Sequence, residues 1–345
     1  MSEYVLNTWY PLTWSRDIGR TLVSRRILGQ QIVLYRSEDG RVTALDDACP
    51  HRLLPLSMGK LKGDTIECGY HGMTFDCSGK CVRIPGQPRI PASAEVRAYP
   101  THENMGLVWI WLGDPALADS SQVFDLPQYH DPRWSAVEGD ALEIGANYLS
   151  LADNLCDPAH VSFVHLSTLG NAASEEVPVQ HEMHDRKLVS WRWILDAPAI
   201  PLFQKFGHFS GNVDRWHYYH YYAPSVAVID FGSAAAGTGA PEGRRDDCVQ
   251  IYACHFITPV DQHSCIDHWL HVKNFHVDEA TNAALSREFR TAFSEDKAIL
   301  EAIQRNEQRL AGRRTIKLAL DVSATRMRRM VAGMVEDEQA REAAA

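Results

Sequence analysis

The sequence predicts an α+β protein in two parts: an N-terminal all-β domain and a C-terminal α+β domain with an antiparallel sheet and flanking helices. Three observations lead to this. The chain has 345 residues, of which 45% are apolar, enough for two cores. Short strand-like runs separated by turns fill the first third. Aromatic and β-branched segments over residues 188–272 precede a long helical pattern that begins near Asp278.

Residues 1–115 form the predicted all-β domain. A hairpin is expected with strands Gln31–Arg36 and Val42–Leu45 and a turn at Glu38–Gly40, and a second hairpin turns at Ser78–Gly79. These repeated strand and turn signals indicate a small all-β domain that is too short to hold the rest of the chain.

Residues 116–134 are polar and contain proline, so they are the predicted linker. Residues 135–345 are the predicted second domain, which opens with a helix. The apolar residues of this helix recur at helical spacing: Leu149, Ala152, Leu155 and Cys156.

The charge balance excludes some partners. The formal charge of −10 and the pI of about 5.9 argue against a nucleic acid or an anionic membrane as the main partner, since both require a basic face. The start of the chain has no signal-peptide pattern, and apolar runs such as Leu107–Leu112 are too short to span a bilayer. We expect a soluble cytoplasmic protein with no nucleic-acid or membrane partner.

Two cysteines and two histidines form mixed pairs, Cys49 with His51 and Cys68 with His71. Zinc fingers usually pair Cys with Cys and His with His. The mixed pairs favour a two-iron cluster of the Rieske type, in which the two cysteines hold one iron and the two histidines hold the other. A structural zinc site is the weaker alternative.

The two ligand pairs are expected at the tips of adjacent hairpins. Pro50 and Gly69 suit tight tips at which backbone N–H groups approach the sulfur atoms.

A second metal site is indicated by "DNLCDPAHVSFVH". His160 and His165 are five residues apart and would lie on roughly the same side of a helix. Two imidazoles and one carboxylate with open positions are typical of non-haem Fe(II) that activates oxygen. By proximity, Asp157 is a candidate third ligand, although its side chain could also face another partner.

With both motifs in place, the chain resembles the oxygenase component of the Rieske non-haem iron oxygenases, and within them the vanillate O-demethylase and dicamba O-demethylase branch. The resemblance rests on the opening "NTWYPL", on "CPHR" and "GYHG", on "DNLCDPAHVSFVH" and on "SEDKAILEAIQ", and it covers nearly the whole chain. It implies a Rieske domain over residues 1–115 and a helix-grip catalytic domain over residues 135–345.

The resemblance also implies roles for single residues. Asp296 becomes the third ligand of one mononuclear Fe(II) per chain, beside one [2Fe–2S] cluster. Asp157 becomes a bridge that hydrogen-bonds an iron-ligand histidine and His71 of the neighbouring subunit, which implies a homotrimer. Asn154 would lie beside the iron.

The implied activity is hydroxylation of an aromatic substrate with O2. The chain has no Gly-rich nucleotide-binding turn, so NADH would be used indirectly, through an NAD(P)H-dependent reductase with flavin and iron–sulfur groups or through a ferredoxin. The preferred prediction is O-demethylation of a methoxylated aromatic acid such as vanillate. The alternatives are ring or side-chain hydroxylation of another aromatic acid, a Rieske electron carrier, and a zinc-stabilised binding protein.

The substrate pocket is predicted from approximate position relative to the family. Asp230, His255 and Arg287 are its candidates, and Arg287 or Arg290 could hold a carboxylate through a bidentate guanidinium contact. The alternatives are an ordinary sheet core for the first two and a solvated helix surface for the arginines.

Overall fold

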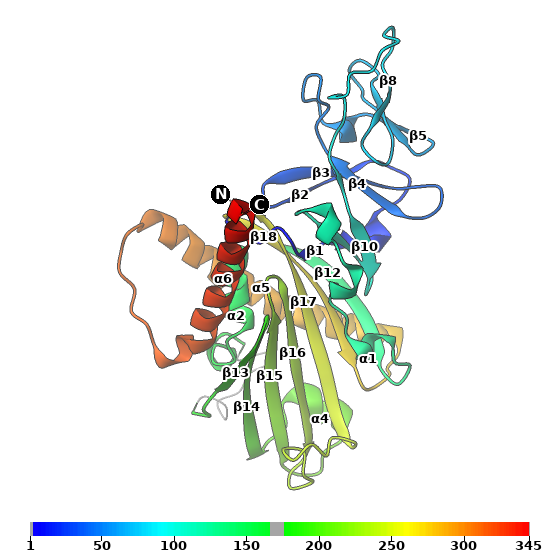
Figure 1. The fold of residues 1–345 in the computed structure, drawn as a ribbon. Coiled ribbons are helices and arrows are strands. Elements are labelled where there is room, and N and C mark those ends of the chain that lie inside the picture. Colours follow the sequence, from blue (N-terminus) through cyan, green and yellow to red (C-terminus); the bar gives the residue numbers. More distant parts are fainter. Residues whose placement is uncertain (1–2, 166–175, 345) are drawn as a thin grey trace. The chain divides into compact units, whose positions relative to one another are not determined.

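A computed structural model describes residues 3–165 and 176–344 (Figure 1). The chain divides into one compact unit of Met1–Asp125 with Glu338–Ala345 and a second of Leu126–Asp337. The division after Asp125 lies inside the predicted linker. The last eight residues group with the first unit, whereas the sequence assigned them to the second domain. The Glu338 carboxylate accepts hydrogen bonds from the backbone N–H groups of Leu6 and Asn7, both at 2.7 Å.

The first unit contains three small antiparallel sheets. The predicted hairpin is present as β3 (Gln30–Arg36) and β4 (Val42–Asp46), which pair in register from Ile32 opposite Asp46 to Arg36 opposite Val42. The strands of the first sheet are β1 (Trp9–Trp14), β11 (Leu107–Trp111) and β10 (Thr101–Asn104). Those of the second are β2 (Val23–Ile27), β3 (Gln30–Arg36), β4 (Val42–Asp46) and β9 (Ala98–Tyr99). Those of the third are β5 (Lys60–Lys62), β6 (Thr65–Glu67), β7 (Thr74–Phe75) and β8 (Cys81–Arg83).

Strand β3 is buried on both faces and separates two cores. Side chains alternate along a strand, so Ile32 and Leu34 enter one core while Val33 and Tyr35 enter the other. The second core also contains the candidate ligands Cys49 and Cys68. The position of the cluster loops is therefore fixed by hydrophobic packing as well as by any bound metal.

The second unit is built on one seven-stranded antiparallel sheet of order β12-β18-β17-β16-β15-β14-β13 (Figure 1). Consecutive strands from β13 to β18 are neighbours, and the predicted antiparallel sheet is confirmed. The strands are β12 (Ser135–Ile144), β13 (Gln180–His184), β14 (Lys187–Ala197), β15 (Val213–Tyr222), β16 (Val226–Ala235), β17 (Cys248–Asp261) and β18 (Ser264–Lys273).

Helices of this unit position the candidate site. The predicted helix around Leu149 is present as α2 (Tyr148–Leu155), and the C-terminal helical pattern forms α5 (Glu279–Arg309) and α6 (Val322–Ala344). The remaining helices are α1 (Pro127–His130), α3 (Val161–Val164) and α4 (Pro201–Gly207). Short 3₁₀ helices lie at Ser15–Asp17, Leu56–Met58, Pro115–Leu117, Ser120–Gln122 and Ala319–Asp321. No helix in the described part of the chain is long and apolar enough to cross a membrane.

Helix α5 covers one face of the sheet because its apolar residues recur every three or four positions. Its N-terminus is capped by Asp278, whose carboxylate accepts a hydrogen bond from the Thr281 N–H at 2.7 Å. Phe289 and Phe293 are buried against Ile251 and other residues of the sheet core. Asp296 follows on the same buried face of the helix, so a carboxylate is carried into the interior.

Candidate metal centres

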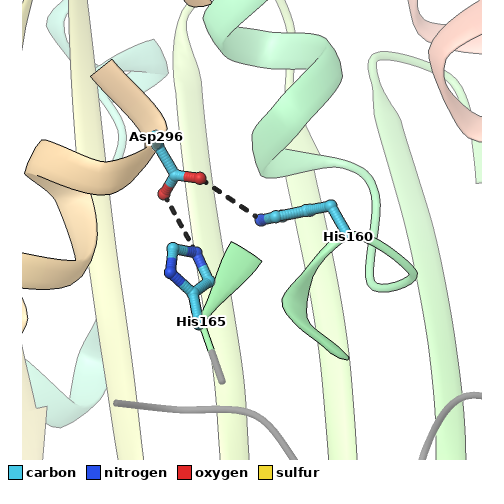
Figure 2. Close-up of side chains that lie close together, drawn as sticks. All are labelled: His160, His165 and Asp296. Carbon is cyan, nitrogen blue, oxygen red and sulfur yellow. Dashed lines mark ion pairs between the residues drawn. The ribbon is translucent and has the colours of Figure 1, made fainter. Parts of the chain in front are cut away.

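Three residues from two distant segments form a candidate site for a mononuclear metal (Figure 2). His160 and His165 flank the short helix α3, and Asp296 projects from α5, with one carboxylate oxygen toward each imidazole. The Nε2 atom of His160 lies 3.6 Å from Asp296 Oδ1, and Nε2 of His165 lies 3.2 Å from Oδ2. One ligand atom from each residue fits within 4.8 Å of the others. This donor set suits a non-haem Fe(II) with open positions.

The outer nitrogen of each imidazole is held by the protein. His165 Nδ1 lies 2.8 Å from Oε2 of Glu295, and His160 Nδ1 lies 2.5 Å from the main-chain carbonyl oxygen of Asp157. When a metal is bound, the tautomer that satisfies both contacts would carry hydrogen on Nδ1 and leave each Nε2 lone pair for the metal. Partners of this kind fix the orientation of metal-binding histidines.

The electrostatics of the site keep Asp296 ionised. Burial opposes ionisation, but the hydrogen bond from His165 and the neighbouring imidazoles hold the pKa of Asp296 below its ordinary value. Burial lowers the pKa of His160 despite the nearby carboxylates, which favours its neutral, ligating form. Burial opposes protonation of His165, but the hydrogen bonds and charges of Asp296 and Glu295 raise its pKa. Before any metal binds, the site thus combines an anionic oxygen donor, one neutral imidazole and a second imidazole whose protonated form the carboxylates favour.

Asn154 and Asp157 take different places around this centre. Asn154 Nδ2 donates to Asp296 Oδ1 at 2.9 Å, while its own Oδ1 is buried with no partner among the described residues. The Asp157 carboxylate accepts from the Ala159 N–H at 2.7 Å and lies 3.9 Å from His160 Nδ1. Asp296, rather than Asp157, joins the two histidines in the structure.

The four candidate cluster ligands lie in two loops of the first unit. Cys49 and Cys68 are buried, whereas His51 and His71 are exposed with ring centroids 4.6 Å apart. Burial, together with the adjacent Cys68 thiol, raises the pKa of the Cys49 thiol. Two neighbouring sulfur donors and two neighbouring imidazoles fit the donor set of a Rieske cluster.

The expected placement of both loops at hairpin tips is wrong for one of them. The loop of Cys68 and His71 joins the antiparallel strands β6 and β7 and is a hairpin tip. The loop of Cys49 and His51 instead leads from β4 to β5, which belong to different sheets. A connection between sheets lets it approach the β6–β7 tip from another direction.

The residues that allow the tight turns are also different from those expected. Positive φ angles occur at Leu53 (59°) and Gly72 (71°), and not at Pro50 or Gly69. Gly69 has another role, because a Cβ atom there would lie 2.9 Å from the Met58 carbonyl oxygen. Gly69 therefore permits the close approach of the two loops.

A cavity opens beside the mononuclear site in the second unit. It is lined on the site side by Asn154, His160, His165 and Asp296, and elsewhere by Leu155, Val161, His217, Tyr219, Ile229, Phe231, Ala253, Phe289 and Phe293. Apolar and aromatic walls with a few polar groups are typical of a small-molecule site.

Asp230 does not line this cavity, because it lies on the other face of β16. Its neighbours in sequence, Ile229 and Phe231, face the cavity, and side chains alternate along the strand. The Asp230 carboxylate instead accepts hydrogen bonds from Trp216 Nε1 at 2.8 Å and Gln250 Nε2 at 2.7 Å. These buried hydrogen bonds account for a carboxylate at this position without any contact to a substrate.

His255 and the two helix arginines also lie outside the lining. His255 is on the cavity face of β17, but its Nδ1 lies 2.8 Å from Asp267 Oδ2, and its ring packs 4.7 Å from that of Phe293. Arg287 is exposed on α5, and Arg290 is exposed in an ion pair with Asp140. The alternative of a solvated helix surface fits both arginines.

Sequence reasoning missed several residues of the site. Glu295 stands directly before Asp296, but nothing in the motif shows that it holds His165. Phe289 and Phe293 could have been found, since they precede Asp296 by seven and three positions and so share its helix face. His217 lies in a strand noted for its aromatic content, and only strand register selects it.

The all-β domain with two Cys/His loops and the buried His/His/Asp group on a helix-covered sheet define a class: the oxygenase components of Rieske non-haem iron enzymes. The Rieske [2Fe-2S] domain family matches residues 8–100, and the vanillate O-demethylase oxygenase C-terminal domain family matches residues 144–337. The chain belongs to the Rieske non-haem iron oxygenases, in the branch of the vanillate and dicamba O-demethylases.

Similar proteins cover nearly the full chain. A putative toluene-4-sulfonate monooxygenase system iron-sulfur subunit of Comamonas testosteroni is 36% identical, over 97% of this chain and 98% of that protein. A vanillate O-demethylase oxygenase subunit of Pseudomonas sp. (strain ATCC 19151) is 34% identical over 92% and 98%. The dicamba O-demethylase oxygenase component of Stenotrophomonas maltophilia is 32% identical over 98% and 99%.

Solved structures agree with this membership. The crystal structure of dicamba monooxygenase bound to dicamba superposes with a TM-score of 0.87 at 31% identity, over 98% of this chain and 99% of that one. The protein is therefore an oxygenase that uses one [2Fe–2S] cluster and one mononuclear non-haem iron. It is therefore neither an independent electron carrier nor a zinc-stabilised binding protein.

Proposed function

We propose that this oxygenase O-demethylates a methoxylated aromatic acid of the vanillate type. The observation that carries the proposal is the position of His160, His165 and Asp296 at a cavity with aromatic walls. A flat ring between such walls would present a substituent to the metal while most of its surface is removed from water. The vanillate and dicamba relatives support O-methyl groups as that substituent.

Residues of this chain prepare the site for oxidation. Asn154 and Glu295 fix Asp296 and His165 through hydrogen bonds, so the donor geometry is set before substrate arrives. Phe289 and Phe293 close the cavity with apolar surface and exclude water from the reacting groups. When bound, the iron supplies O2 activation for insertion of oxygen into a C–H bond.

The overall reaction balances with electrons from outside the chain. Insertion of one oxygen atom into a methoxy C–H bond gives a hemiacetal, which splits into formaldehyde and a phenol. The second oxygen atom leaves as water, which takes up two electrons and two protons. A reductase or ferredoxin supplies these electrons one at a time through the Rieske cluster.

The positions of the side chains support the proposed ligands and electron path. Cys49, His51, Cys68 and His71 would hold the cluster. His71 is exposed in the chain, and the Asp157 side chain keeps 22% of its surface accessible. Asp157 can therefore link His160 to the cluster ligand His71 of a neighbouring subunit in a homotrimer.

A second candidate is hydroxylation of a methyl group on an aromatic sulfonate. Two toluene-4-sulfonate monooxygenase subunits of Comamonas testosteroni are 36% and 35% identical over 97% of this chain. The same iron and cavity would serve, because a ring methyl group and a methoxy group both present C–H bonds beside an aromatic ring.

The deciding experiment is O2 uptake by the holoenzyme with a surrogate reductase. The substrates are 3- and 4-methoxybenzoates, vanillate and toluene-4-sulfonate, with formaldehyde and benzylic alcohol measured as products. Formaldehyde in a one-to-one ratio with O2 supports demethylation, and benzylic alcohol from the sulfonate supports the second candidate. Substrate-independent O2 uptake with neither product contradicts both.

A further inference from the structure

One wall of the iron cavity contains a polar group that the proposed chemistry does not use. His217 lines the cavity from β15, is only 6% exposed, and lies opposite the apolar Phe231 of β16 in the strand register. Its Nδ1 atom is buried and has no hydrogen-bond partner among residues 3–165 and 176–344. A buried polar atom without a partner costs free energy, and this imidazole lines the cavity, so a ligand bound there can supply the missing partner.

Two buried arginines stand beside this histidine on the same face of the sheet. Arg192 of β14 is directly opposite His217 in the register of the strands, and Arg215 precedes His217 by two positions on β15. Their exposed fractions are 2% and 1%. Arg192 also donates to the Pro158 carbonyl oxygen at 2.7 Å, which ties it to the loop before His160.

The charges of the two arginines act on this wall. Burial lowers the pKa of Arg192, and burial and then the positive charge of Arg192 lower the pKa of Arg215 to about 10. Guanidinium groups remain cationic at neutral pH. Burial and the two guanidinium charges lower the pKa of His217 well below its ordinary value, so the imidazole is neutral. A neutral imidazole in a positive field can donate one N–H group to an anion.

We propose that His217, in the field of Arg192 and Arg215, forms the subsite that receives the oxyanion of an aromatic acid substrate. Asp296 is the only carboxylate among the described residues of the cavity lining, and it belongs to the metal group, so an incoming anion meets no other negative side chain there. The acid group would bind at the sheet wall while the ring lies against Phe231 and the phenylalanines of α5, of which Phe289 packs edge to face with Phe231 at the cavity wall.

This subsite replaces the arginines expected from the sequence. Arg287 and Arg290 are exposed on α5 and cannot reach a buried acid. The inference rests on the proposed oxidation of an aromatic acid, and it specifies that the substrate binds as the anion of that acid. A carboxylate and a sulfonate share the required oxyanion chemistry.

Equilibrium binding to the oxidised, iron-loaded holoenzyme without reductase tests the subsite apart from turnover. The probes are 4-methoxybenzoate, toluene-4-sulfonate and the neutral 4-methoxybenzamide. His217→Leu removes the donor, and His217→Asn keeps an N–H group near the Nδ1 position. His220→Leu is the matched control, because it makes the same change two positions beyond Tyr218 on the opposite face of β15.

We expect His217→Leu to weaken binding of at least one acid by about ten- to hundredfold, as for loss of a hydrogen bond to a charged group, and to leave the amide within about twofold. His217→Asn should restore most of the acid affinity, and His220→Leu should change neither ligand. The acid that loses more affinity identifies carboxylate or sulfonate as the natural group.

The inference is overturned if the acid and the amide weaken equally, or if neither changes, in a variant whose iron content and visible spectrum match those of the wild type. Failure of the proposed demethylation looks different. In that case the acid would still bind through His217, but no methoxylated acid would yield formaldehyde.

Discussion

The two candidate metal centres differ in their access to solvent. At the cluster loops both histidines are exposed, and so is Leu53, at 73%. At the mononuclear site His165 and Asp296 are 3% and 6% exposed. The first arrangement suits a group that exchanges electrons with another protein, and the second suits a reaction that must exclude water.

The centres also differ in how the chain builds them. The four cluster ligands come from 23 consecutive positions, Cys49 to His71, in two short loops whose backbones approach closely at Gly69. The mononuclear group joins His160 to Asp296, which lie on separate helical segments 136 positions apart. Local motifs can therefore define an exposed electron port, whereas a buried catalytic site needs the whole domain.

The largest expected effect comes from breaking one centre at a time. Asp296→Ala removes the only anionic donor of the mononuclear group, so we expect iron to fall from about three to about two atoms per chain and turnover to cease. Iron analysis and the visible spectrum of the cluster measure this.

The converse variant, Cys68→Ser, should remove the cluster absorption and leave about one iron per chain. If Asp296→Ala also removed the cluster absorption in a folded protein, the two centres would not be independent, which would contradict this prediction.

A second prediction concerns the proposed link between the centres. Asp157→Asn keeps the main-chain carbonyl that holds His160 Nδ1, so both metals should remain bound. The loss of the carboxylate charge should slow turnover by about 100-fold, at the upper end for residues that support metal ligands. Stopped-flow reoxidation of the reduced cluster by O2 with substrate present measures the step, and reoxidation at the wild-type rate would show that Asp157 is not the link.

The third prediction addresses the hydrogen bond that Glu295 forms with His165 at the buried centre. Glu295→Ala removes the acceptor of His165 Nδ1 and should weaken iron binding by about tenfold, without effect on the cluster spectrum. Iron loss to a chelator over time measures it. Glu288→Ala, an exposed glutamate two turns earlier on α5, is the control. If both variants lost iron to the chelator at the same rate, Glu295 would not contribute to iron binding through His165.

The smallest effect is expected at the exposed cluster loops. Leu53→Ala should raise the KM for the reductase by about two- to fivefold, as for truncation of one apolar contact, and change the free energy of unfolding by less than about 0.5 kcal/mol. Ile316→Ala, at another exposed apolar residue, should leave the KM unchanged. If both variants behave alike, the exposed leucine does not contact the electron donor.

Much of the fold was predictable, because its signals are local. The hairpin of β3 and β4, helix α2 and the C-terminal helices follow from hydrophobic periodicity and turn residues within short windows. The path of the first cluster loop was not predictable, since the sequence does not show that β4 and β5 join different sheets.

Of the site, the residues alone indicated His160 and His165 but left Asp157 as the nearest carboxylate. Resemblance to a family suggested Asp296, and the structure then brought it to the two histidines. The pocket candidate Asp230 lies outside the cavity for a simpler reason. A shift of one position along β16 moves a side chain to the opposite face, which separates Asp230 from Phe231.

By itself, then, the sequence determined the class of chemistry, because the type and spacing of metal-binding side chains that lie close together in the chain indicate which metal group they can hold. Tertiary structure alone decided which surfaces face the iron. His217 and its two arginines are distinguished from the other polar residues of neighbouring strands only by register and burial. The free energy of a buried polar atom depends on what surrounds it, and those surroundings are assembled from segments that the chain order keeps apart.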